Sequence, residues 1–574
     1  MPAAPRVSPA TAILAALALF ALAYVLRVIG IDWGYSHGDE RINIAAKVLT
    51  GQLVPDNHYY PPLYDYINAA ILGVLFVFGK LTGLWASTGE FRDAYFTDDT
   101  VFYLAVRMGT AFFAAMVAPL FFLVARGLRL PLAACLATGL AGVFLPTGVI
   151  LSHIAKSDVP LATTGILLIL LILARLRTDR SLALDLALGL AIALGISFKQ
   201  TFVLLAAPML LVLTVLLIRR IGIGPTLAAA GRALLVAIIC IPIFNIGIFL
   251  DLENFLDYQA IQSVMSMRDD AFLASALVTL KLVLTPTNGL SAIGFLLYLV
   301  FPLAALAAGS ALPQRGALLL LWACTLLTAL ITIAIVGTRQ HNGLWIMDFT
   351  AMQLFAGLSV AALMVSASSM VRPLGLAAAA ALLVFTGLGI WEINRQALAT
   401  PIKQTVAEFL RESYPNSPIL TLARLDFPKT PEVQAFLVSR DERLAEKYDV
   451  VLPEVAAERA APDLPADALQ VLHKPIILWG LENATDEDLE GAVQAFAWPG
   501  QPEEWTVQYW QDLGYEVFIT ANLPFALSGG NGRYVQAYAE DLVAQCEVVL
   551  EVEPVKTLYI EDLVTVFDCP DTAS

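Results

Sequence analysis

Two short stretches of the sequence carry carboxylates next to long apolar segments. The first, Ser36–Arg41 (Ser-His-Gly-Asp-Glu-Arg), follows an apolar segment, and the second, His153–Pro160 (His-Ile-Ala-Lys-Ser-Asp-Val-Pro), precedes one. Carboxylates beside an apolar phase are costly unless they bind something or take part in acid–base chemistry. Each stretch also has a structural interpretation, because Asp39 or Asp158 can cap the helix that follows it. Neither stretch alone decides between capping and chemistry.

A third motif lies between these two, and other polar residues gather in the same set of loops. The stretch Tyr59–Tyr64 (Tyr-Tyr-Pro-Pro-Leu-Tyr) leads into an apolar helix, and its two prolines make the start of that helix rigid. An ordinary hairpin needs no such arrangement. A cluster of polar residues on one face is what an outward-facing catalytic site requires. The loops 31–100, 152–158, 199–201, 251–289 and 338–344 also contain His37, His58, His153, His341, Lys156, Lys199, Arg268 and Arg339.

The composition indicates a polytopic membrane protein. Hydrophobic residues make up 58% of the 574 residues and charged residues 14%, against about 45–50% and about 25% in soluble domains. A soluble protein of this composition would expose large apolar patches. The net charge of −15 argues against nucleic-acid binding, and five cysteines in this length argue against a disulfide-rich scaffold.

Charge divides the chain into two domains. Residues 395–574 contain 12 Lys and Arg but 30 Asp and Glu, a net charge of −18, whereas residues 1–394 have a net charge of +3. We therefore predict a transmembrane body at 1–394, with 31–100 as its first outer loop, and an acidic soluble α/β domain at 395–574. That domain shows an amphipathic helix at 405–413 and short strand-like runs at 419–423, 450–452, 476–479, 517–520, 548–552 and 557–560.

The positive-inside rule orients the predicted spans, because ten arginines between residues 126 and 372 fall in alternate tight loops. Those loops and the N-terminus then face the cytoplasm. The acidic domain lies on the periplasmic, extracytoplasmic side of a bacterial-type inner membrane. The apolar segment 63–84 cannot then make a net crossing, so we expect it to lie in or dip into the outer leaflet. The eleven spans are predicted near residues 10–30, 101–125, 131–151, 159–174, 182–198, 202–218, 233–250, 290–309, 316–337, 345–366 and 373–393.

The order of these motifs resembles the GT-C class of glycosyltransferases. A first span, Asp39-Glu40, a Pro-Pro-Leu-Tyr helix, a span led by Arg107 and an Asp-x-Pro loop at Asp158 occur in that order, and Lys199 ends the fifth span where the class often has a lysine. The resemblance is strongest over residues 10–210 and is closest to protein O-mannosyltransferases and lipid A aminoarabinose transferases. It implies a GT-C-like α-helical membrane fold with glycosyltransferase activity.

The resemblance also implies a reaction. A sugar would move from a polyprenyl-phosphate carrier to an acceptor hydroxyl on a lipid, glycan or protein, with inversion at the anomeric carbon. Asp39 would be the general base, with Glu40 and Asp158 as further catalytic candidates. The leaving lipid phosphate needs cations, because fixed positive charge in a water-poor site stabilises it. The candidates for this role are Arg41, Lys199 and Arg339, followed by Lys156, Arg268, His341, His58 and Tyr60.

Two alternatives remain open. Asp39, Glu40, Asp158 and the histidines could converge on a divalent cation, although no spacing here is diagnostic of a metal site. A lipid-linked glycan flippase or transporter would share the hydropathy profile. Such a transporter predicts polar residues along the inner faces of the spans, whereas in this sequence they gather at one surface.

The cysteines give a prediction for the acidic domain. Cys135, Cys240 and Cys324 lie inside apolar spans, where a thiol behaves as a small hydrophobe. Cys546 and Cys569 are the two cysteines of residues 395–574, and each borders a strand-like run. An unpaired exposed thiol is a liability in an oxidising compartment, so we expect a Cys546–Cys569 disulfide.

Overall fold

The computed structural model describes residues 7–55, 57–266, 270–339, 342–425, 427–449, 464, 466–474, 501–559 and 561–569. The chain forms two compact units. The larger unit, called the membrane body below, comprises Met1–Asp32, His37–Phe78 and Phe102–Ala397. The smaller unit, called the tail unit, comprises Trp33–Ser36, Gly79–Val101 and Leu398–Ser574.

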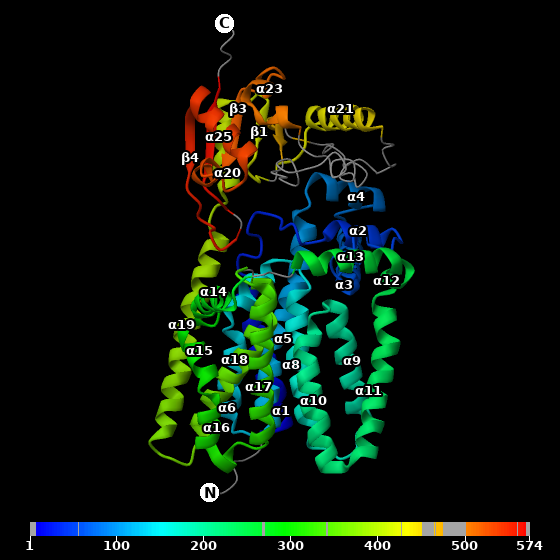
Figure 1. Cartoon of the computed structure of the whole chain (residues 1–574), viewed down its shortest axis with the longest axis vertical. Coiled ribbons are helices and arrows are strands. Elements are labelled where there is room, and N and C mark those ends of the chain that lie inside the picture. The colour runs from blue at the N-terminus through cyan, green and yellow to red at the C-terminus, as the bar shows by residue number, and fades with distance from the viewer. Residues whose placement is uncertain are drawn as a thin grey trace. The chain divides into compact units, whose positions relative to one another are not determined.

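The membrane body is built from apolar helices. Its first helix begins after Ser8, whose side chain accepts a hydrogen bond from the N–H of Thr11, and has a proline in its first turn. Figure 1 shows α10, α11 and α17 running roughly parallel, whereas α13 lies across their direction. The helices are α1 (Pro9–Val28), α2 (Ile42–Leu49), α3 (Leu63–Thr82), α5 (Thr100–Gly127), α6 (Leu132–Val143), α7 (Pro146–Ile150), η1 (Leu151–His153), α8 (Asp158–Arg175), α9 (Leu182–Phe198), α10 (Phe202–Ile221), α11 (Ile223–Phe244), α12 (Ile246–Leu250), α13 (Leu252–Ser266), α14 (Phe272–Leu284), α15 (Ser291–Leu299), α16 (Phe301–Ala308), η2 (Gly309–Ala311), α17 (Arg315–Val336), α18 (Asn342–Val365) and α19 (Val371–Leu398).

The helix lengths confirm a polytopic membrane protein. Among the described residues, nine helices are long and apolar enough to cross a membrane, and two bent helix pairs bring the total to eleven. That total agrees with the predicted number, but its members differ. Helix α3 has the length and hydropathy of a span, whereas α9 has only 17 residues. The expectation that α3 stays in the outer leaflet remains a prediction.

Helix α18 occupies the centre of the membrane body. Of the residues in its most apolar stretch, 94% are buried, and the helix packs against α6, α8, α15 and α16. Close packing is possible because small residues face its neighbours. An added Cβ at Gly357 would lie 3.0 Å from Ala141 Cβ and 3.3 Å from Thr138 Cα. Polar side chains on this helix are therefore enclosed by the protein.

The tail unit contains a mixed five-stranded sheet in the order β2-β1-β3-β5-β4. Strand β1 pairs in parallel with β2 and β3, whereas β5 pairs antiparallel with β3 and β4. The strands are β1 (Ile419–Thr421), β2 (Val471–His473), β3 (Val517–Ala521), β4 (Glu547–Val552) and β5 (Val564–Asp568). The helices are α4 (Thr88–Thr97), α20 (Ile402–Ser413), α21 (Pro431–Tyr448), η3 (Pro502–Trp505), α23 (Val507–Gln511), α24 (Leu523–Leu527) and α25 (Arg533–Gln545).

The sheet separates two apolar cores, as the two-residue period of a strand requires. Phe518 of β3 and Phe567 of β5 contribute to one core, whereas Val517, Ile519 and Val566 contribute to the other. The helix at 405–413 and the runs at 419–423, 517–520 and 548–552 are confirmed as α20, β1, β3 and β4. The strand predicted at 557–560 is wrong, because residues 557–559 form a turn. The strands predicted at 450–452 and 476–479 lie outside the described residues.

A segment from the start of the chain belongs to the tail unit. The Trp33 ring stacks on Tyr559 with ring centroids 4.8 Å apart. The Tyr35 hydroxyl donates to Glu561 Oε1 at 3.0 Å, and the same oxygen accepts the N–H of Ile402 at 2.9 Å. The chain therefore passes through the tail unit directly before it reaches His37.

The predicted disulfide is confirmed. Cys546 and Cys569 are bonded across 23 residues, at the start of β4 and just after β5. The bond ties together strands that also share ladder hydrogen bonds.

We expect the double substitution Cys546→Ser and Cys569→Ser to lower the free energy of unfolding of the tail unit by about 2–4 kcal/mol, because the unfolded chain regains loop entropy. Urea titration of the purified protein with limited proteolysis of the tail unit measures this loss. Cys240→Ser, a thiol of the membrane body, is the control. Equal protease resistance of the double variant and the wild type would contradict the prediction.

Candidate functional site

A cavity of about 440 Å³ in the membrane body brings several of the predicted site residues together. Charged and amide side chains from the loops make up part of its wall, and apolar side chains of α8, α10, α17 and α18 make up the rest. The lining residues are Asp39, Tyr59, Tyr60, Lys156, Leu161, Lys199, Gln200, Thr201, Leu204, Gln259, Thr332, Ile335, Val336, Arg339, Gly343, Leu344, Met347 and Asp348.

The ammonium of Lys156 lies between two carboxylates. Its Nζ is 2.6 Å from Asp39 Oδ2 and 3.4 Å from Asp158 Oδ2. The other oxygen of Asp158 accepts from Lys199 Nζ at 2.6 Å. Asp158 is fully buried, whereas the Asp39 side chain keeps 35% of its surface exposed. Asp39 lines the cavity and Asp158 does not, so Asp39 is the carboxylate of this group that a ligand in the cavity can reach.

Electrostatics keep the ammonium of Lys156 charged. Burial by itself lowers the pKa of Lys156, but the negative charges of Asp158 and Asp39 outweigh it, so that the pKa lies above its ordinary value. The ring of Tyr60 lies 5.7 Å from Lys156 Nζ and 5.5 Å from Lys199 Nζ. Burial raises the pKa of the Tyr60 phenol above its ordinary value. Tyr60 thus remains a neutral aromatic contact for both cations.

Glu40 lies next to Asp39 but faces away from the cavity into the protein. Arg107 donates to both its oxygens, from Nε to Oε1 and from Nη2 to Oε2, each at 2.7 Å. The N–H of Ala155 donates to Oε1 at 2.8 Å, and the N–H of His37 donates to Oε2 at 2.7 Å. Glu40 therefore connects α5, the first outer loop and the loop before α8.

The loop that contains Tyr60 is fixed by Arg41. This guanidinium donates to the carbonyl oxygens of Asn57 at 3.0 Å and Tyr60 at 3.2 Å, and lies 3.4 Å from Asp65 Oδ2. It also lies 5.9 Å from the centre of the Tyr60 ring. Arg41, a predicted phosphate contact, holds the backbone that presents Tyr60.

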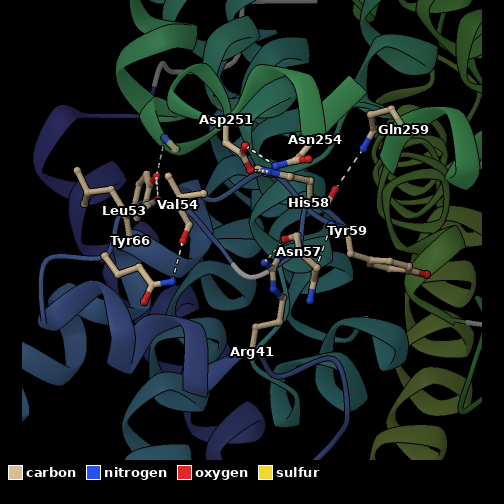
Figure 2. Close-up of polar contacts among 12 residues, drawn as sticks. Arg41, Leu53, Val54, Asn57, His58, Tyr59, Tyr66, Asp251, Asn254 and Gln259 are labelled. Carbon is tan, nitrogen blue, oxygen red and sulfur yellow. Dashed lines mark hydrogen bonds and ion pairs between the residues drawn. The ribbon is translucent and has the colours of Figure 1, made fainter. Parts of the chain in front are cut away.

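His58 holds the same loop from its other side. Figure 2 shows His58 and Asp251 pointing toward each other, with Nε2 and Oδ2 2.7 Å apart. This hydrogen bond lowers the pKa of Asp251, and Asn254 donates to the same carboxylate at 2.7 Å. Gln259 of α13 donates to the carbonyl oxygen of His58 at 3.2 Å and also lines the cavity. His58 is therefore a loop contact rather than a lining residue.

The predicted site residues divide into three sets. Those that line the cavity are Asp39, Tyr60, Lys156, Lys199 and Arg339. A second set does not line the cavity in the described part of the chain but contacts the lining residues or their loops. It consists of Glu40, Arg41, His58 and Asp158. Arg268 and His341 lie outside the described residues.

Several polar residues of the cavity wall were not predicted from the sequence. Thr332 of α17 and Asp348 of α18 line the cavity, as does Gln200 beside Lys199. A carboxylate inside an apolar segment was the available signal for Asp348, because such residues are rare in spans and usually functional.

The described residues do not form a metal-binding cluster. Nowhere in the part of the chain that the structure describes do three or more His, Cys, Asp or Glu side chains come close enough to hold an ion. Asp39 and Asp158 are separated by Lys156, and Glu40 is occupied by Arg107.

Comparison with known proteins relates this chain to others through structure. No family model matches it, and no curated protein matches its sequence. Crystal structures of ArnT from Cupriavidus metallidurans match at 14% identity. The apo state has a TM-score of 0.52 over 97% of this chain and 98% of that chain. The form bound to undecaprenyl phosphate has a TM-score of 0.49 over 96% and 97%.

A more distant match is the oligosaccharyltransferase AglB from Archaeoglobus fulgidus, in complex with an inhibitory peptide and a dolichol-phosphate. Its identity is 12% and its TM-score 0.46, over 92% of this chain and 71% of that chain. The likeness to apo ArnT, which spans nearly the whole of both chains, confirms the predicted GT-C-like fold.

We expect Arg107→Gln to destabilise the membrane body by about 3–5 kcal/mol, because it leaves the buried Glu40 carboxylate without its charged partner. Glu40→Gln combined with Arg107→Gln should cost less than the sum of the single changes. Unfolding in detergent, followed for all four proteins of this cycle, measures the coupling. Strict additivity would contradict the assignment of this pair.

Proposed function

We propose that this protein is a membrane glycosyltransferase that moves a sugar from a polyprenyl-phosphate carrier to an acceptor hydroxyl, with inversion. The observation that carries the proposal is the position of Asp39. It is a partly exposed carboxylate at a cavity that also contains three cations and an apolar wall. The fold shared with ArnT, a protein with a known structure bound to undecaprenyl phosphate, supports the same function.

The cavity has the chemistry of each part of such a donor. Lys199 and Arg339 offer charge for the phosphate, and Lys156 lines the same cavity and shares Asp158 with Lys199. Leu204 and Val336 belong to the apolar part of the lining, which suits the first isoprene units. Charge-assisted contacts in a partly enclosed site are stronger than in water, because water competes less for the same groups.

Asp39 is the proposed general base. Its neighbour Lys156 favours the ionised form, which is the form that accepts a proton. As the acceptor oxygen bonds to the anomeric carbon, its proton moves to Asp39. The bond between that carbon and the phosphate oxygen breaks, and its electron pair leaves with the lipid phosphate. Glu40 and Asp158 are positioning residues in this proposal, because Glu40 fixes the backbone beside Asp39 and Asp158 holds the two lysines.

We place this chemistry on the extracytoplasmic side of a bacterial-type inner membrane. Ten arginines in alternate loops support a cytoplasmic N-terminus. The Cys546–Cys569 disulfide supports an oxidising compartment for the tail unit. The acceptor would be a lipid, glycan or protein hydroxyl that is available on that side.

We expect Asp39→Asn to lower turnover by about 10²- to 10⁴-fold, because the amide cannot accept the proton. The assay follows release of undecaprenyl phosphate from undecaprenyl-phosphate-linked hexoses and pentoses, with and without cell-envelope membranes as the source of acceptor. Asp93→Asn, which alters an exposed carboxylate of α4, is the matched control. Asp158→Asn should cause a smaller loss than Asp39→Asn.

Near wild-type turnover of Asp39→Asn would show that another group is the base. Binding of the lipid-linked sugars with no acceptor-dependent release of undecaprenyl phosphate would instead favour a lipid-linked glycan flippase or transporter.

We expect Lys199→Met to weaken binding of undecaprenyl phosphate by about tenfold, because a charge-assisted hydrogen bond contributes about 1.5–3 kcal/mol. Native mass spectrometry or thermophoresis with the protein in nanodiscs measures the dissociation constant. Lys80→Met, an exposed lysine at the end of α3, is the control. An unchanged dissociation constant for Lys199→Met would remove this residue from the phosphate site.

A further inference from the structure

Asp348 differs from the other buried carboxylates of the membrane body. It is 1% exposed and lies within α18, the most enclosed of the described helices that are long enough to span a membrane. Asp185, also buried in an apolar helix, accepts from Arg175 at 2.7 Å and from Arg232 at 2.6 Å. For Asp348, the hydrogen-bond partner within the described residues is the hydroxyl of Thr332, at 3.1 Å from Oδ2. Its Oδ1 is buried and has no hydrogen-bond partner there.

Even the contact with Thr332 is shared. Thr332 Oγ1 lies 3.1 Å from Asp348 Oδ2 and 3.0 Å from the carbonyl oxygen of Thr328. A hydroxyl has one proton, so it can donate fully to only one of these oxygens. A buried carboxyl group with so little hydrogen bonding is costly, which a purely structural role does not explain.

The same part of the cavity contains a second polar group without a partner. Gln200 lines the cavity, and its buried Nε2 donates to no described residue. The packing of α10 against α17 joins the two sites, because Thr328 donates to the carbonyl oxygen of Leu204 at 3.1 Å. Gln200 lies four residues before Leu204, in the turn that leads into α10, and Thr332 follows Thr328 by one turn of α17. The cavity thus has an amide donor and a carboxyl acceptor in addition to its cations.

We infer that Asp348 determines sugar specificity, by hydrogen bonding through Oδ1 to a hydroxyl of the sugar on the carrier, with Gln200 as a second polar contact. This inference rests on the proposed function. The hydrogen-bonding groups of the sugar-bearing carrier indicate that the sugar is the part that contacts Asp348. A prenyl chain has no hydrogen-bonding groups, and an ionised phosphodiester only accepts. The sugar is therefore the part of the donor that can donate to a carboxylate, and a hydroxyl suits either protonation state of Asp348 because it both donates and accepts.

The experiment compares a bare carrier with sugar-bearing carriers. Full-length protein in nanodiscs is titrated with undecaprenyl phosphate and with undecaprenyl phosphate linked to glucose, mannose, galactose or arabinose, without acceptor. We expect the wild type to bind at least one sugar-bearing carrier about tenfold more tightly than undecaprenyl phosphate, as a hydrogen bond to a charged group allows. Asp348→Leu should lose this tenfold preference and keep the dissociation constant of undecaprenyl phosphate. Asp348→Asn should keep part of the preference, because its amide oxygen still accepts.

Two control variants separate this role from others. Lys199→Met should weaken the bare and the sugar-bearing carriers by the same factor, because it acts on the phosphate. Ser359→Ala, on the same helix but bonded to the carbonyl oxygens of Leu297 and Phe355, should change neither constant. We expect Asp348→Leu to unfold at or above the wild-type temperature, because a leucine replaces a carboxyl group that lacks hydrogen bonds. If Asp348→Leu does not fold, Asp348→Asn and Asp348→Ser decide by the same comparison.

Several results would overturn the inference. A preference that survives in the Asp348 variants, or an equal loss of bare and sugar-bearing carriers, excludes sugar recognition by this residue. A wild-type protein that binds undecaprenyl phosphate but gains nothing from any of the four sugars overturns the inference and leaves the proposed function standing. A wild-type protein that binds none of the five lipids overturns the proposed function itself, and the inference with it.

Discussion

The buried carboxylate of Glu40 sets the distance between Asp39 and Lys156. It accepts hydrogen bonds from the N–H groups of His37 and Ala155, while Arg107 neutralises it from α5. His37 lies just before Asp39 in the chain and Ala155 just before Lys156, so that one side chain fixes the backbone on both sides of their ion pair. A buried ion pair adds little net stability compared with apolar residues, but removal of one partner is severe. Its main contribution here is a single arrangement of the loops, on which the geometry of the cavity depends.

Most of the fold could be predicted from the sequence, because a membrane leaves an apolar segment few choices. Backbone groups in lipid must be satisfied within the segment, so a long apolar run becomes a helix. Breaks within a run are harder to predict. Residues 131–151 were expected as one span, but Pro146 starts a new helix there, and the pair is bent by 51°. In the tail unit, strand-like composition predicted β1, β3 and β4, whereas the run at 557–560 fails because residues 557–559 turn.

The candidate site was predictable only where its chemistry is local in sequence. Asp39, Lys156 and Lys199 stand in short motifs at the ends of apolar segments, and all three line the cavity. The partners of a side chain are set by the tertiary fold, which short motifs do not contain. His58 was considered for phosphate, but it is bonded to Asp251, 193 residues away. Asp348 was overlooked because it has no motif around it, and its significance depends on the cavity beside it.

Charge conservation explains why the proposed reaction suits this cavity. A carrier phosphodiester has one negative charge, and the phosphate monoester that leaves can hold two. Asp39, as the proposed base, would lose its own negative charge when it accepts the proton of the acceptor hydroxyl. One negative charge therefore moves from Asp39 to the phosphate, and the total charge does not change. Lys156 lies 2.6 Å from Asp39 and is linked through Asp158 to Lys199. It is therefore placed to lose the charge of Asp39 as its partner while the charge on the leaving phosphate forms. Because a change in net charge is costly in a water-poor site, proton transfer and departure of the phosphate favour each other.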